Sequence, residues 1–163
     1  MANTKVEDKA KILGEETENI QTFLTLEDVL GRDTDELTAL ATGVFDTEKL
    51  GPVPFTAIDY AEYRQAKKDC MKISVEDGIV NTSIDDDKLM VKIILLAVDK
   101  DARSNFTFAS KALLEKLDVP TADAVVGKLL SPGEVTNFAV AIQNLSGFSR
   151  KKAKKDAEDI KNS

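Results

Sequence analysis

Three consecutive acids, Asp85 to Asp87, are residues whose type could do chemistry, because carboxylates bind divalent cations. They immediately precede an almost uncharged stretch, Leu89 to Val98. Neighbouring side chains at the start of a helix point in different directions, and the helix dipole stabilises each carboxylate there by about 0.3–1 kcal/mol. We therefore expect these acids to cap a helix rather than to bind a metal.

Two further motifs suggest ligand binding and then fail on their details. Asp99 and Asp101 resemble the first half of a calcium-binding loop, but the sixth position, which requires glycine, is Ser104. Gly127 and Lys128 lack the upstream glycine and the following Ser or Thr of a phosphate-binding loop. We expect no metal, no bound nucleotide and no cofactor.

The lone cysteine and the paired aromatic residues are the remaining candidates. Cys70 could be a nucleophile, but no histidine is present to activate it and it falls on the apolar side of a predicted helix. The pairs Tyr60/Tyr63 and Phe106/Phe108 could stack on bases, but no basic strip accompanies them. We expect all five side chains to pack in the core.

Composition narrows the function classes. The 163 residues contain no His, no Trp and one Cys, which excludes a Ser/His/Asp triad, a zinc site with histidine ligands and an intrachain disulfide. The net charge of −7 argues against nucleic acid or anionic membrane as a partner. An enzyme would need carboxylates alone, and the spacing locates no convergent pair, so we expect no enzyme. An unpaired thiol, no secretory signal and no membrane span predict a cytoplasmic protein.

The segments that carry these residues are mostly helical by periodicity. We expect a mostly α fold: a compact multi-helix domain with one or two small β-hairpins as a minor element. Gly51, Pro52 and Pro54 predict the first hairpin within residues 44–58, and Gly78 predicts either a second hairpin or an irregular loop within 73–84. Helices are expected near residues 23–30, 33–43, 59–71, 89–98, 106–117, 120–130 and 131–147.

Charge and apolar spacing divide the chain into three parts. Residues 1–21 are predicted to be a flexible N-terminal arm, residues 22–148 a helical core domain and residues 149–163 a basic mobile tail. Six basic and three acidic side chains give the last sixteen residues a charge of +3. We expect this tail to be solvated, and the alternative is an attachment for an acidic partner.

A family resemblance lies in the order of these segments. The stretch from Leu129 to Phe148, which ends in Ser-Gly-Phe, resembles the closing helix of the XkdN-like tail assembly chaperones of phages and phage-derived contractile particles. Leu50 to Tyr63 is similar to the strand-then-helix entry of that family, and Phe108 to Pro120 is similar to its middle helices. The resemblance covers roughly residues 22–148.

The resemblance implies binding and brings no catalytic residues. Such chaperones coat the long helical tape measure protein in the host cytoplasm until tail tube proteins polymerise around it. It therefore implies the tape measure protein as partner, with the tail tube protein and further copies of the chain as additional partners. We hypothesise that an amphipathic client helix lies on an exposed apolar patch, with acidic flanks such as Glu27, Asp28 and Asp85 to Asp87 favouring basic client residues.

Candidate client contacts are Phe23, Leu26 and Leu30, because the helices from Leu89 onward have one another to pack against. The alternative function is a structural tail or baseplate component that stays in the mature particle, with the basic tail docked on a neighbouring subunit.

Overall fold

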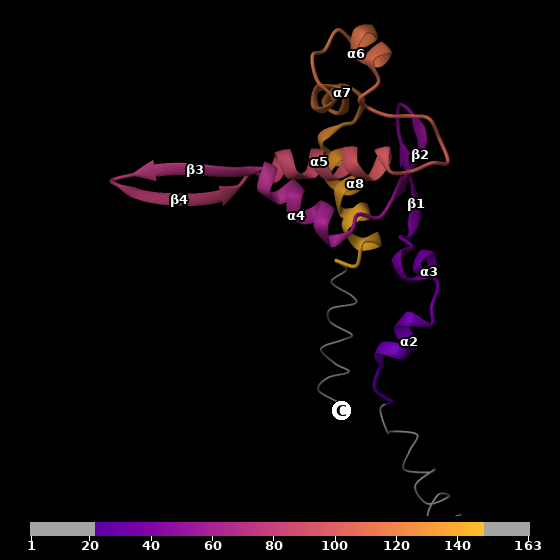
Figure 1. Cartoon of the computed structure of the whole chain (residues 1–163). Coiled ribbons are helices and arrows are strands. Elements are labelled where there is room, and N and C mark those ends of the chain that lie inside the picture. Colours follow the sequence, from indigo (N-terminus) through magenta and orange to yellow (C-terminus); the bar gives the residue numbers. More distant parts are fainter. Residues whose placement is uncertain (1–21, 149–163) are drawn as a thin grey trace, which may run out of the picture. The chain divides into compact units, whose positions relative to one another are not determined.

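The structure of the chain is a computed structural model that describes residues 22–148. The predicted arm and basic tail, residues 1–21 and 149–163, lie outside the described residues. The chain divides after Ala39 into two compact units. Figure 1 labels their helices and strands.

The described part of the first unit holds two five-residue helices, α2 (Leu26–Leu30) and α3 (Thr34–Thr38). Thr25 and Asp28 form a capping box that starts α2, and the Asp33 carboxylate accepts a hydrogen bond from the Asp35 N–H to start α3. Helix α3 ends at Thr38 rather than near Gly43, because Ala39 is already extended. Neither helix buries a residue.

The second unit begins with the antiparallel hairpin β1 (Thr42–Thr47) and β2 (Gly51–Thr56). Pro52 and Pro54 are tolerated because the sheet has two strands and β2 therefore has a free edge. Val53 and Phe55 are buried, so this hairpin is a wall of the core.

Five helices complete the second unit: α4 (Tyr60–Asp69), α5 (Asp86–Asp99), α6 (Lys111–Leu117), α7 (Ala122–Leu129) and α8 (Pro132–Leu145). Helix α5 lies at the centre and packs against α8, α4, α7 and β2, as its almost uncharged sequence predicted. The capping box of Ser131 and Glu134 starts α8, as predicted. Helix α6 is shorter than predicted, because Ser110 caps it and Phe106 lies in the preceding loop.

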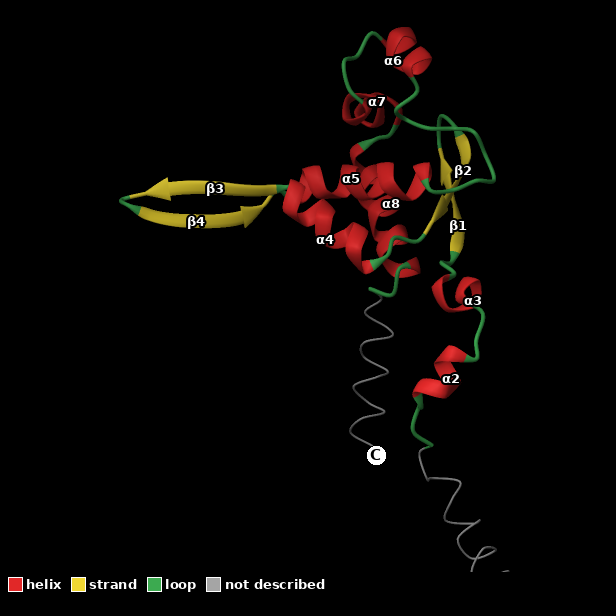
Figure 2. Cartoon of the chain, viewed as in Figure 1, coloured by secondary structure: helices red, strands yellow, loops and turns green. Residues whose placement is uncertain are grey.

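The hairpin β3 (Met71–Glu76) and β4 (Ile79–Ile84) extends away from this core, and only Ile84 at its base packs against it. It projects from the junction of α4 and α5 as an isolated two-stranded ribbon (Figure 2). Asp77 and Gly78 form its turn with positive φ angles of 52° and 79°, a pair typical of a two-residue hairpin loop. The Asp85 N–H donates to the Cys70 carbonyl and closes its base.

The predicted fold class, mostly α with one or two small hairpins, is wrong. Half of the described residues are helical and 19% are in strands, in two antiparallel two-stranded sheets, so the fold is a mixed α+β fold. Both hairpins pair along six residues of each strand. The prediction relied on helical periodicity and gave too little weight to short segments in which apolar and polar residues alternate. The turns at Gly51 and Gly78 fix these segments as strands.

Candidate interaction surfaces

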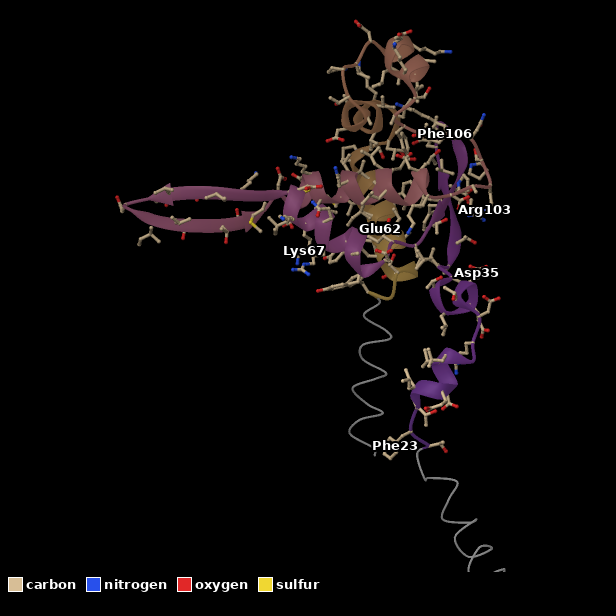
Figure 3. All side chains as sticks on the ribbon, viewed as in Figure 1. Phe23, Asp35, Glu62, Lys67, Arg103 and Phe106 are labelled. Carbon is tan, nitrogen blue, oxygen red and sulfur yellow. The ribbon has the colours of Figure 1, made fainter. Side chains whose placement is uncertain are left out.

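The predicted client contacts lie on the first unit, on and just before α2. Phe23, Leu26 and Leu30 are exposed by 77%, 67% and 72%, and Figure 3 labels Phe23. Leu26 and Leu30 are four residues apart and share one face of the helix. The Thr25 N–H donates a hydrogen bond to the Asp28 carboxylate, and hydrogen bonding with Thr25 lowers the pKa of Asp28. Asp28 therefore carries a negative charge beside this face. We call residues 22–39 the N-terminal segment.

The acids that the sequence marked as candidates have structural roles. Asp85 is the N-cap of α5, accepts from the Lys88 N–H, and pairs with Lys72 at 3.3 Å between Nζ and Oδ2. The predicted capping role of Asp85 is confirmed. Asp99 accepts a hydrogen bond from the Thr107 hydroxyl, and Asp101 accepts from the Thr56 hydroxyl.

The aromatic residues and Cys70 agree with the predicted packing, with one exception. Cys70 is buried, and burial raises the pKa of its thiol. Phe106 packs edge-on against the buried Phe108, and Tyr63 packs against Phe148 with ring centroids 4.8 Å apart. Tyr60 was expected in the core, but it stands at the first position of α4 and is 76% exposed.

The surface that sequence reasoning missed is one face of the β3–β4 hairpin. Cross-strand partners lie on the same face of a ribbon, and successive pairs along the strands lie on opposite faces. One face, which we call the ribbon face, therefore carries Met71, Ile73, Val75, Val80, Thr82 and Ile84. The other face carries Lys72, Ser74, Glu76, Ile79, Asn81 and Ser83. All the ribbon-face side chains are exposed except Ile84, which is half-buried.

A concavity of about 740 Å³ lies where the ribbon face meets α4. Its walls include Met71 and Ile84 from the hairpin and Tyr60 from α4. Arg64, Lys67 and Lys68 also line it, and we call these three residues the basic patch. Figure 3 labels Lys67 near the base of the hairpin.

The alternation of Met71, Ile73 and Val75 in β3 is the signal that could have located the ribbon face. It is matched across the turn by Val80, Thr82 and Ile84 in β4. This period-2 pattern predicts a strand with one apolar face. Nothing local predicts that the face is left uncovered, because that depends on the direction in which the hairpin leaves the core.

The two surfaces define the chain as an α+β protein with large apolar side chains displayed on a helical segment and on a projecting ribbon. The sequence model of the phage XkdN-like tail assembly chaperone family matches residues 20–161, so the chain belongs to this family. The match extends beyond Phe148, where the resemblance read from the sequence stopped.

A solved structure has the same fold at low sequence identity. The crystal structure described as that of the protein yqbn is similar to 79% of this chain and to 100% of its own chain, with a TM-score of 0.53 and 17% identity. At this identity the similarity concerns the fold alone. No curated protein sequence matches the chain.

Within residues 22–148, every helix is too short or too polar to cross a bilayer.

Proposed function

We propose that this tail assembly chaperone binds the tape measure protein and keeps it soluble while tail tube proteins assemble around it in the host cytoplasm. Family membership supports the chaperone role. The observation that carries the client-binding step is the exposure of Phe23, Leu26 and Leu30 on a segment that buries none of its own side chains.

The proposed mechanism is capture of an amphipathic client helix without catalysis. Apolar client side chains would cover Leu26 and Leu30, removing apolar surface from water at roughly 25 cal/mol per Å². Glu27 and Asp28 lie in the first turn of α2 beside this face and favour client helices with basic flanks.

The test is co-purification of a tagged tape measure protein with the full chain from co-expressing cells. Phe23→Asp together with Leu30→Asp should abolish co-purification, while circular dichroism remains that of the wild type. Thr22→Asp together with Thr34→Asp is the matched control, because it adds the same two charges to the N-terminal segment and removes no large apolar side chain. Retention of the double variant on the client would remove these residues from the site.

The alternative, a structural component of the particle, gives a different result in the same host. A chaperone should be depleted from purified mature particles, whereas a tail or baseplate subunit should be present in fixed stoichiometry. Stoichiometric incorporation would overturn the proposal even if the tape measure protein also co-purified.

A further inference from the structure

The chain leaves α8 against the face of α4 that lines the concavity. Gly147, with φ of 99°, follows the end of α8 and turns the chain. Phe148 then packs on the ring of Tyr63 of α4. Tyr63 is four residues before Lys67, which lines the concavity, so the two side chains share one face of the helix. Residues 149–163 therefore begin beside the concavity.

The concavity combines apolar surface with cations. Tyr60 and Met71, on its walls, are 76% and 48% exposed. The three residues of the basic patch are exposed, and none of them forms an ion pair with another described residue. Such a surface fits a segment that carries both apolar and acidic side chains.

The residues that follow Phe148 have this chemistry at a helical spacing. Ala153, Ala157 and Ile160 are four and three residues apart, so on a helix they share one face. Asp156 and Asp159 lie on one flank of that face. The basic side chains Arg150, Lys151, Lys154, Lys155 and Lys161 lie on the other flank or on the opposite face, and Lys152 falls beside Asp156. The segment therefore carries acids next to its apolar face although its net charge is positive.

The length of the segment fits the length of α4. The helix continues for six residues after Tyr63, a rise of about 9 Å. Asp156 follows Phe148 by eight residues, a rise of about 12 Å even in a helix. A helix that begins near Phe148 therefore reaches the end of α4, beside Lys68, with Asp156. Ile160 follows one turn later, at the base of the β3–β4 hairpin.

We propose that residues 149–163 fold back as a helix along α4 of the same chain and cover the concavity. Ile160 packs on Met71, and Asp156 and Asp159 pair with the basic patch. The cations of the segment face solvent. The sequence alone predicted a solvated tail, and this arrangement leaves only its basic side in water. An apolar partner of the concavity must first displace the segment.

A zero-length carbodiimide cross-link tests the ion pairs in the unmodified full chain, because it joins a carboxylate to an amine only when the two are in contact. Peptide mass spectrometry should find Asp156 or Asp159 joined to Lys67 or Lys68. A mixture of ¹⁴N- and ¹⁵N-labelled chains separates links within one copy from links between copies. Absence of these links, or links between copies only, would overturn the proposal.

The rate of Met71 oxidation by peroxide tests the apolar contact. Ile160→Ser should make Met71 oxidise several-fold faster than in the wild type, because its cover is lost. Lys155→Ser makes the same replacement on the solvent side of the segment and should leave the rate unchanged. Met90 of α5 is the reference within each sample. Equal rates in the Ile160→Ser variant and the wild type would exclude Ile160 from the concavity.

Charge reversal tests the pairing of the segment with the basic patch. Lys67→Glu with Lys68→Glu should speed Met71 oxidation, and so should Asp156→Lys with Asp159→Lys. All four changes in one chain should restore the wild-type rate and the cross-link. Failure of restoration, with the circular dichroism of the wild type, would contradict the proposed pairing. No tape measure protein enters these measurements, so they and the test of the proposed function can fail independently.

Discussion

Asp101 joins the loop after α5 to the β1–β2 hairpin. Its buried carboxylate accepts from the Arg103 backbone N–H at 2.9 Å and from the Thr56 hydroxyl at 3.0 Å. The Arg103 guanidinium donates to the same carboxylate and to the carbonyls of Gly43 and Phe55, on β1 and β2. These hydrogen bonds, led by those from Arg103, lower the pKa of Asp101 to about 2.

Asp101→Asn should therefore lower the free energy of unfolding at neutral pH by about 1–3 kcal/mol, because the amide cannot accept all of these hydrogen bonds. The folded pKa lies below the ordinary value of 3.8, so the unfolded chain binds more protons between these values. Wild-type stability from Asp101 is present above about pH 4 and is lost as the pH falls toward about 2.

Urea unfolding at several pH values measures both effects. The difference between wild type and Asp101→Asn should shrink as the pH falls through this range. Glu115→Gln, the same kind of change at an exposed helical site, should alter stability by less than about 0.5 kcal/mol. A variant deficit that persists unchanged at low pH would show that the ionised carboxylate is not what stabilises the loop.

Phe138 is the aromatic residue through which helix α8 packs on the β1–β2 hairpin. It is fully buried. Its ring stacks on that of Phe45 of β1 with the centroids 4.4 Å apart, and it packs edge-on against Phe55 of β2 with the centroids 5.3 Å apart. Phe138→Ala should cost about 3–5 kcal/mol in thermal or urea unfolding. Val140→Ala, on the exposed side of the same helix, is the control and should cost far less. Equal costs would contradict this packing.

At the scale of helices and strands, capping residues and apolar periodicity were sufficient to predict a helix where the segment packs on the core. Leu89 to Val98 predicted the central helix α5, and Ser131 with Glu134 predicted the start of α8. Periodicity gave a wrong prediction where the position of a residue depends on a tertiary contact. Phe106 was assigned to a helical face, but it lies in a loop and packs on Phe108, a contact that no local pattern encodes.

The β3–β4 hairpin shows that sequence patterns are limited in the same way when they are used to predict a binding surface. Its strands were predicted as one of two possibilities, and its turn residues were identified. Its exposed apolar face was missed because a sequence does not state whether an apolar strand face is covered by the core. The candidate contacts on α2 were chosen by the converse argument, that no neighbour was available to cover them.

The turn of this hairpin gives an element-scale prediction. Gly78 has φ of +79°, which an L side chain adopts with strain, although space for a Cβ is open. Gly78→Ala should therefore loosen β3 and β4 while α5 keeps its stability. Hydrogen exchange resolved by segment measures this, with faster exchange expected within Met71–Ile84 only. Gly127→Ala is the control, because its site in α7 is open and its φ is not positive.

Slower or unchanged exchange in the hairpin of Gly78→Ala would contradict the turn geometry. Faster exchange across α5 as well would show that the hairpin stabilises the core.

On the scale of the whole molecule, the proposed client contacts and the buried core belong to different units. Leu26 and Leu30 lie in the first unit and are exposed, whereas the buried residues among those described lie in the second unit. Exposed side chains that pack on nothing contribute little to the free energy of unfolding. Client affinity and folding stability should therefore respond to different substitutions.

The prediction is that Leu26→Ser with Leu30→Ser weakens the binding of a purified amphipathic fragment of the tape measure protein and leaves the unfolding temperature unchanged. Calorimetric titration and thermal unfolding of the same samples measure the two effects. Ile142→Ala, at a fully buried position of α8, should do the reverse: it should lower the free energy of unfolding by about 2–5 kcal/mol and leave the affinity of the folded protein unchanged. Equal affinity of the wild type and the leucine variant for the fragment would exclude Leu26 and Leu30 from the client site.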